Sequence, residues 1–144
     1  MRIAYALLAQ AAEFTPDGRL YCMSGDLESL NVQSVPVMLP MLVVLAKFIV
    51  DAPESGRPHL IRLAAFGPDN TRLPIGMETP LVPPAANAES KVGICINIAN
   101  VELPAAGQYI FRLEMDNIEV ARLPLFIRVA LGPPSQQQIQ GRLS

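Results

Sequence analysis

The chain has 144 residues, of which 51% are hydrophobic and 17% are charged. This length suits a single domain, and the apolar fraction predicts a filled core and argues against disorder of the main body. The net charge is −2, and the basic residues are scattered singly, so no basic stripe is available to bind nucleic acid. They are Arg2, Arg19, Lys47, Arg57, Arg62, Arg72, Lys91, Arg112, Arg122, Arg128 and Arg142.

The cysteine content and the apolar runs bear on location. Cys22 and Cys95 are too few for a disulfide framework and lack CxxC spacing. We expect them to be small buried hydrophobic residues, and a disulfide between them is the less favoured alternative. Residues 1–12 are too short for a signal peptide, and residues 35–50 contain two prolines and a lysine. We therefore expect no membrane segment and a cytoplasmic location.

The first 50 residues predict strands. Residues 3–8 alternate at strand period although their composition favours a helix, and we predict a strand. The turn residues Thr15-Pro16-Asp17-Gly18 precede an extended segment and predict a first hairpin. Residues 41–50 are apolar at both parities, with Lys47 marking the outer side, which predicts a strand covered on both faces. The second face is covered either by the N-terminal segment or the Pro-rich connection, or by a second copy or a partner.

The middle of the chain is expected to contain one strand and one long loop. Residues 59–66 predict a strand that ends at the turn Gly67-Pro68-Asp69-Asn70. Residues 73–87 hold four prolines and show no period. We predict a long, partly extended connection there, of a kind that often carries binding residues.

The last third shows the clearest alternation. Residues 91–98 predict a half-buried antiparallel strand, and residues 108–116 predict another after the turn 103–107. Asp116-Asn117 suits a two-residue hairpin turn. The inward parity of the return strand changes between Ala121 and Arg122, which predicts a β-bulge there. The expected inward side chains are Val92, Ile94, Ile96 and Ile98, then Tyr109, Phe111, Leu113 and Met115, then Ile118 and Val120, and beyond the bulge Leu123, Leu125, Ile127 and Val129.

These elements predict an all-β fold, an antiparallel β-sandwich. Its single domain is expected to span residues 1–130. A flexible tail rich in Gly, Pro and Gln is expected at residues 131–144.

The segment LPAAGQYIFRLEMDNIEVARLPLFIRV, residues 103–129, resembles the last hairpin of immunoglobulin-like sandwiches. In that family a tyrosine at this place returns a hydrogen bond from its hydroxyl to the backbone a few residues upstream, and Tyr109 is the matching residue. Phe111 stands where the family has its disulfide cysteine, and the chain has no tryptophan. The resemblance implies an immunoglobulin-like topology without the antibody hallmarks.

The beginning of the chain, MRIAYALLAQAAEFTPDGRLYCMSGD, together with this ending is similar to a group of small uncharacterised bacterial proteins. This similarity implies a bacterial, cytoplasmic protein. It assigns no activity to any residue.

Chemically reactive residues are few. His59 is the only histidine, and because no nucleophile motif accompanies it, we expect a strand-end histidine near the surface. Asp17, Asp69 and Asp116 are expected to be turn residues, with a shared calcium site as the alternative. Glu114 and Glu119 should lie near each other across the last hairpin as solvated charges rather than as a glycosidase pair. No catalytic, cofactor-binding or metal-binding residue is assigned.

The sequence leaves the function unknown and favours a non-catalytic binding or structural module. Such a module would dock a protein partner or a second copy through loops at one end or through an exposed sheet face. The alternatives are an enzyme or carbohydrate-binding protein that uses loop carboxylates and His59, and a secreted adhesin-like domain. No cofactor, nucleic acid or membrane partner is expected.

Overall fold

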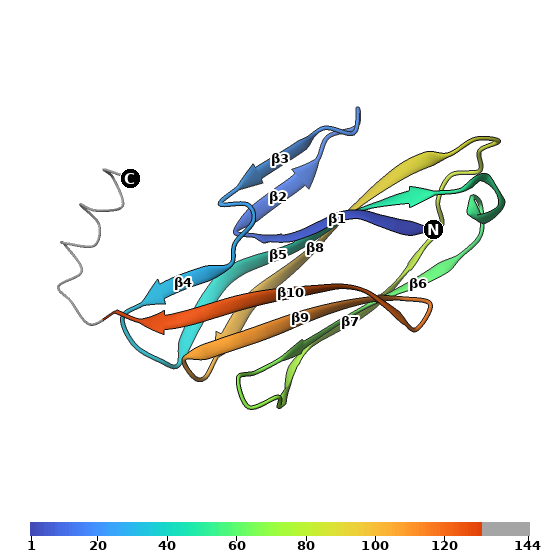
Figure 1. The fold of residues 1–144 in the computed structure, drawn as a ribbon. Helices are drawn as coiled ribbons and strands as arrows, with labels where there is room; N and C mark the ends of the chain where they lie inside the picture. The colour runs from blue at the N-terminus through green and yellow to red at the C-terminus, as the bar shows by residue number, and fades with distance from the viewer. Residues whose placement is uncertain (131–144) are drawn as a thin grey trace.

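The computed structural model describes residues 1–130, and the tail predicted at residues 131–144 lies outside them. The described chain is all-β, with one short 3-10 helix (Figure 1). The strands are β1 (Arg2–Ala9), β2 (Ala11–Phe14), β3 (Leu20–Met23), β4 (Ser29–Val32), β5 (Val37–Val50), β6 (His59–Phe66), β7 (Arg72–Leu81), β8 (Ser90–Leu103), β9 (Gly107–Met115) and β10 (Ile118–Val129), and the helix is η1 (Ala52–Glu54).

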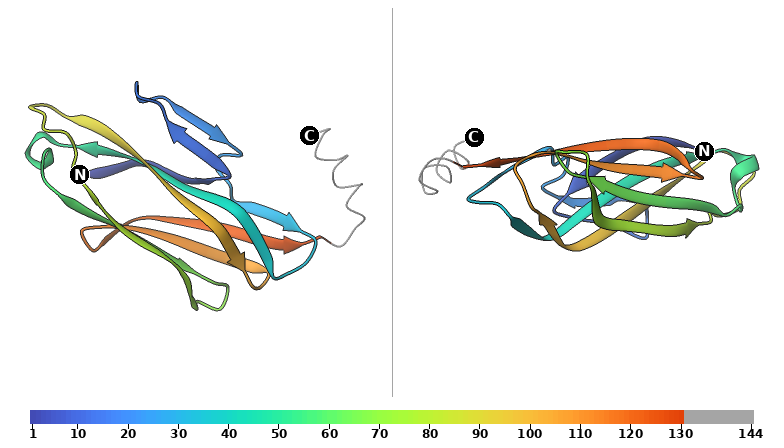
Figure 2. Two further views of the ribbon diagram at one scale, coloured as in Figure 1. Left: turned by 180° about the vertical axis from the view of Figure 1, so that it is seen from behind. Right: turned by 90° about the horizontal axis from the view of Figure 1, so that it is seen from below.

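Two sheets pack face to face around a shared core. One has the order β1-β5-β8 and the other the order β4-β10-β9-β6-β7, and β2 and β3 form a separate hairpin. In Figures 1 and 2 this hairpin lies beside the three-stranded sheet, away from the five-stranded one. The hairpin is therefore a third layer over part of the fold.

The predicted antiparallel arrangement is right for every pairing except one. Strand β4 runs parallel to β10, from Ser29 opposite Phe126 to Val32 opposite Val129. The reason is that the chain leaves β1, forms the hairpin and crosses to the other sheet before β4 begins. The Leu27 N–H marks the crossing, since it donates to the Leu8 carbonyl oxygen at 2.8 Å.

The core lies between the inward faces of β5 and β9. Alternate residues of both strands are buried there, because apolar side chains gain free energy when they leave water. Phe48 and Phe111 are each 0% exposed. The predicted inward set of β9 is confirmed: Tyr109, Phe111, Leu113 and Met115 all belong to this core.

The predictions for the first half of the chain are confirmed in three places. Residues 2–9 form strand β1 and not a helix. The turn at residues 15–18 closes the hairpin β2–β3, with the Gly18 N–H donating to the Thr15 carbonyl oxygen at 2.9 Å. Strand β6 has the predicted bounds, and the Asn70 N–H donates to the Gly67 carbonyl oxygen in the turn that follows.

The long connection predicted at residues 73–87 is wrong for its first part. Residues 72–81 form β7, which pairs antiparallel with β6. A proline cannot donate a hydrogen bond to a neighbouring strand, but an edge strand has only one neighbour. Since β7 lies at the edge of its sheet, it accommodates Pro74 and Pro80.

The last hairpin agrees with its prediction except in the place of the bulge and at Ile118, which was expected to point inward but is 68% exposed. Asp116 and Asn117 have φ of 52° and 67° and form the two-residue turn. The pairing of β10 with β9 shifts between Glu119 and Ala121, so the bulge precedes the predicted position. Val120 and Ala121 are both half-buried, and for this reason the apolar pattern does not show where the parity changes.

Tyr109 fastens the turn between β8 and β9. Its side chain is 0% exposed. Its hydroxyl donates to the Ala105 carbonyl oxygen at 2.6 Å and accepts from the Ala105 N–H at 3.0 Å. One side chain thus satisfies both backbone groups of a residue in the turn.

The substitution Tyr109→Phe tests this contact. It should lower the free energy of unfolding by about 1–3 kcal/mol, because the Ala105 N–H and carbonyl oxygen lose their partner. Urea denaturation of the purified protein measures the change. Tyr21→Phe is the matched control, since Tyr21 is 65% exposed, and equal stability of the two variants would contradict the role of the Tyr109 hydroxyl.

Candidate functional site

The outer face of β5 is covered by the hairpin β2–β3. Val43 and Leu45 point away from the main core, yet they are 1% and 0% exposed. They form a second apolar cluster with residues of β1, the hairpin and β8. Of the two explanations for the doubly apolar strand, covering by the N-terminal segment is confirmed for this stretch. The cluster comprises Ala9, Val43 and Leu45, with Tyr5, Leu7, Ala12, Leu20 and Cys95 packed against it.

The Phe14 ring attaches the hairpin to the sheet by packing against Gly93. A Cβ atom at Gly93 would lie 2.6 Å from the nearest atom of the Phe14 ring. No real Cβ approaches another atom so closely, so the ring uses the space that the glycine leaves free. The aromatic side chain at the end of β2 therefore rests directly on the backbone of β8.

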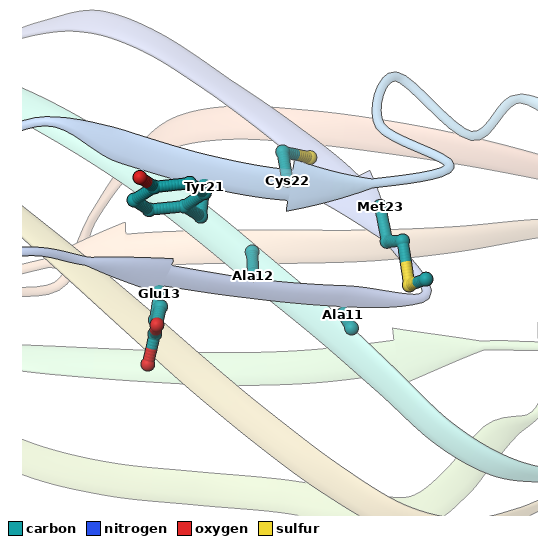
Figure 3. Close-up of a pocket in the computed structure, with 6 residues that line it drawn as sticks. All are labelled: Ala11, Ala12, Glu13, Tyr21, Cys22 and Met23. Carbon is teal, nitrogen blue, oxygen red and sulfur yellow. The ribbon is translucent and has the colours of Figure 1, made fainter.

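The other face of the hairpin is exposed and carries large apolar side chains. Tyr21 is 65% and Met23 is 68% exposed. Because residues two apart on a strand share a face, the two side chains lie on the same side of the hairpin. Their cross-strand partners on β2, Glu13 and Ala11, lie on that side too. Together with Ala12 and Cys22 these residues line an open hollow of about 370 Å³ (Figure 3).

The hairpin also decides the surroundings of the two cysteines. Both are free, and Cys22 is exposed while Cys95 is half-buried. The expectation that both are buried is wrong for Cys22, which is exposed although it has the same parity on β3 as the packed residue Leu20. Burial beneath the hairpin raises the pKa of the Cys95 thiol above its usual value. Burial also raises the pKa of Tyr5, with the thiols of Cys95 and Cys22 as further causes.

Phe14→Ala should loosen the hairpin and expose Cys95. We expect the Cys95 thiol to react roughly tenfold faster with a small disulfide reagent, because both solvent access and the thiolate fraction increase. The rate is measured in a Cys22→Ser background, so that a single thiol is followed. Tyr21→Ala alters the opposite face of the same hairpin and should leave the rate unchanged. A rate unaffected by Phe14→Ala would show that the ring does not hold the hairpin in place.

His59 joins two parts of the five-stranded sheet. It begins β6, and its side chain is only 9% exposed. Its Nδ1 lies 2.7 Å from Asp116 Oδ2, and its Nε2 lies 3.4 Å from the Glu54 carbonyl oxygen. The second carboxylate oxygen of Asp116 accepts from the Leu60 N–H at 2.9 Å. The histidine is a strand-end residue, as predicted, and it is tied to the β9–β10 turn.

These contacts favour the ionised form of Asp116. The Leu60 N–H lowers the pKa of the carboxyl group first, and the His59 side chain lowers it further. A carboxyl group whose pKa is lower in the folded state stabilises the fold above its unfolded pKa. That contribution disappears as the pH falls through the lowered value.

Asp116→Asn should therefore make the unfolding free energy less dependent on pH in the acid range. Asparagine tolerates the positive φ of this position and offers an oxygen to the Leu60 N–H, but it does not titrate. We expect wild type to lose more stability than the variant below about pH 4. Urea denaturation at a series of pH values measures both curves. Parallel curves would mean that the Asp116 contacts do not contribute to acid unfolding.

The loop carboxylates do not gather into a site. Asp17, Asp69 and Asp116 lie in the β2–β3, β6–β7 and β9–β10 turns, which are well separated (Figure 1). Within residues 1–130, no group of three or more His, Cys, Asp or Glu is placed to hold a metal ion. The alternative of a calcium site shared by these three turns is therefore wrong.

Glu114 and Glu119 lie opposite each other across the last hairpin, as expected. Arginines surround them on the outer face of the sheet. Arg122 Nη2 lies 3.0 Å from Glu119 Oε1, and Arg62 Nη1 lies 4.0 Å from Glu114 Oε2. This neutralised arrangement suits a solvated sheet face.

The exposed face of the hairpin is the feature that sequence reasoning missed. The turn at residues 15–18 predicted a hairpin, but the alternation in residues 19–23 did not show which side of it would meet the sheet. The pairing of exposed Tyr21 and Met23 becomes visible only once Phe14 is seated on Gly93.

Comparison with known proteins gives a family but no activity. The model of a family described as "Family of unknown function (DUF6941)" matches residues 4–128. The match includes β2 to β9 completely and most of β1 and β10. No curated protein matches the sequence. In the part of the chain that the structure describes, no helix is long and apolar enough to cross a membrane.

Proposed function

The chain belongs to this family of unknown function, and we propose that it is a non-catalytic module that binds another protein through the outer face of the hairpin β2–β3. The observation that carries the proposal is the exposure of Tyr21 and Met23 side by side on that face. Tyrosine and methionine are enriched in protein interfaces, where they supply large apolar contact areas.

The chemistry of the hairpin defines the kind of partner. Its exposed face carries Tyr21 and Met23 with Glu13 opposite Tyr21, and it has a polar tip, where Arg19 Nε lies 3.2 Å from Asp17 Oδ2. Apolar side chains bordered by charged ones are the usual composition of a protein interface. The partner is expected to present an apolar patch with a hydrogen-bond acceptor for the Tyr21 hydroxyl.

The surroundings of His59 support a role without catalysis. Both of its ring nitrogens have partners, and its side chain is almost fully buried between β6 and the β9–β10 turn. A catalytic base needs a free nitrogen close to a nucleophile and to a space for substrate. The contacts of His59 instead hold two segments of backbone together.

The proposed fold of the module is immunoglobulin-like. The order β10-β9-β6-β7 corresponds to strands G, F, C and C′ of that fold, and β1-β5-β8 corresponds to A, B and E. The hydrogen bonds of Tyr109 to Ala105 have the form of a tyrosine corner at the start of strand F. On this reading the hairpin β2–β3 is an insertion into the first strand.

We also propose a cytoplasmic location in a bacterium. The free thiols of Cys22 and Cys95 support it, because unpaired cysteines persist in reducing compartments. The bacterial origin rests on the resemblance of the two ends of the chain to small bacterial proteins.

Photo-crosslinking in cells tests the binding proposal. A photoreactive amino acid replaces Met23 in one variant and Ile118 in the other. Both native side chains are 68% exposed, but Ile118 lies at the β9–β10 turn and not on the hairpin. The variant at position 23 should give a discrete adduct to another protein that the variant at position 118 does not give.

Affinity measurements with the captured protein complete the test. The double variant Tyr21→Ala/Met23→Ala should bind it about a hundredfold more weakly, because both side chains are at the centre of the proposed contact. Ile118→Ala should bind like wild type. Identical adducts at positions 23 and 118, or undiminished binding by the double variant, would reject the hairpin as the docking face.

A further inference from the structure

We infer that β8 is a docking edge for a second copy of this chain, which pairs with it through its own β8. The inference concerns a different surface from the hairpin face and does not depend on it. It rests on the unpaired edge of β8, on the open core beside that edge, and on two charges near the ends of the strand.

Strand β8 is the longest edge strand of the two sheets. It has β5 on one side and no strand on the other among the described residues, and it spans Ser90–Leu103. The unpaired N–H and carbonyl groups of such an edge form hydrogen bonds with any extended strand that aligns with them. Proteins usually block these edges with prolines, bulges, charges or very short strands. Strand β8 contains no proline, and its two charged residues and its irregular residue Asn100 lie near its ends.

The other edges of the two sheets are shorter than β8 and are in part blocked. Strand β7 contains Pro74 and Pro80, and β4 has only four residues. Strand β1 is followed by the crossing of the chain, with the Leu27 N–H bound to the Leu8 carbonyl oxygen. This contrast makes β8 the edge that is open to a partner strand.

The core is incompletely closed along the same edge. Val92, Ile94 and Ile98 point inward from β8 but are only partly buried, whereas the inward residues of β5 from Leu42 to Val50 are fully buried. A hollow of about 260 Å³ lies between β7 and β8, and its lining includes Leu63 and Val101 of the core. A further strand beside β8 would shield these side chains.

The charges on β8 suit pairing with itself. Lys91 and Glu102 are both exposed, and neither has an ionic partner among residues 1–130. They stand near opposite ends of one strand. In an antiparallel pair of two such strands, the basic end of each therefore meets the acidic end of the other.

The register of this pairing follows from the apolar pattern. The inward row passes from Ile98 to Val101, and Asn100 between them has φ of 54°. The pairing of β8 with β5 keeps one register through this point, so Asn100 is an extra residue only with respect to the second copy. With Ile96 opposite Ile96 of the second copy and Asn100 as an extra residue, every pair has both side chains on the same face. Lys91 then lies opposite Glu102 of the second copy, and this contact occurs twice in the dimer.

The hollow next to β8 lies beside β7. A second copy brings a strand to this edge with complementary charges already in place.

Sedimentation equilibrium of the full chain tests the inference with charge reversals. Wild type should form a dimer. Lys91→Glu and Glu102→Lys should each associate about tenfold more weakly, because each reversal places like charges opposite each other at two places. An equimolar mixture of the two variants should associate as tightly as wild type, since both contacts then join opposite charges.

The mixture also controls for folding, because a misfolded variant would not restore association. Wild type that remains monomeric up to about 1 mM would overturn the inference. A dimer whose affinity is the same in wild type and both single variants would also overturn it, and would assign the contact to another surface. The same conclusion would follow if the single variants were weakened and the mixture were not restored.

Discussion

Strand β5 carries apolar side chains on both of its faces, and the fold has to cover both of them. The inward face meets the five-stranded sheet, where Phe48 packs in the main core. The outward face would leave Val43 and Leu45 in water, and burying each of them stabilises the fold by about 1.5–3 kcal/mol. The hairpin β2–β3 supplies this cover, and its attachment through Phe14 and Gly93 follows from the same requirement.

Covering one surface creates another. A two-stranded hairpin has two faces, and once one is packed on the sheet, its alternate residues point to solvent. In this chain those residues are Tyr21 and Met23. The exposed face of the hairpin is therefore a direct consequence of how β5 is buried. A hairpin that only covered β5 would not need large apolar side chains at these two outward positions.

The sequence predicts well the features that depend on neighbouring residues. Alternation identified β6 and β9, and turn residues identified the hairpins at Asp17-Gly18 and Asp116-Asn117. It predicts poorly the features that depend on distant pairing. Pro74 and Pro80 indicated a loop because only the sheet order shows that β7 is an edge strand. Likewise, the alternation along β3 gives Cys22 the same side as Leu20, and only the three-dimensional arrangement shows that Cys22 is exposed.

Because the hairpin is inserted between β1 and β4, its outer residues can vary independently of the two main sheets. The hairpin interrupts neither main sheet, since β1 pairs with β5 and β4 pairs with β10 on their own. Only its inner residues, chiefly Phe14 and Leu20, are bound to the fold by packing. Four outward positions, two on each strand, can therefore be exchanged without repacking either core. Grafting of new recognition surfaces onto this scaffold should begin there.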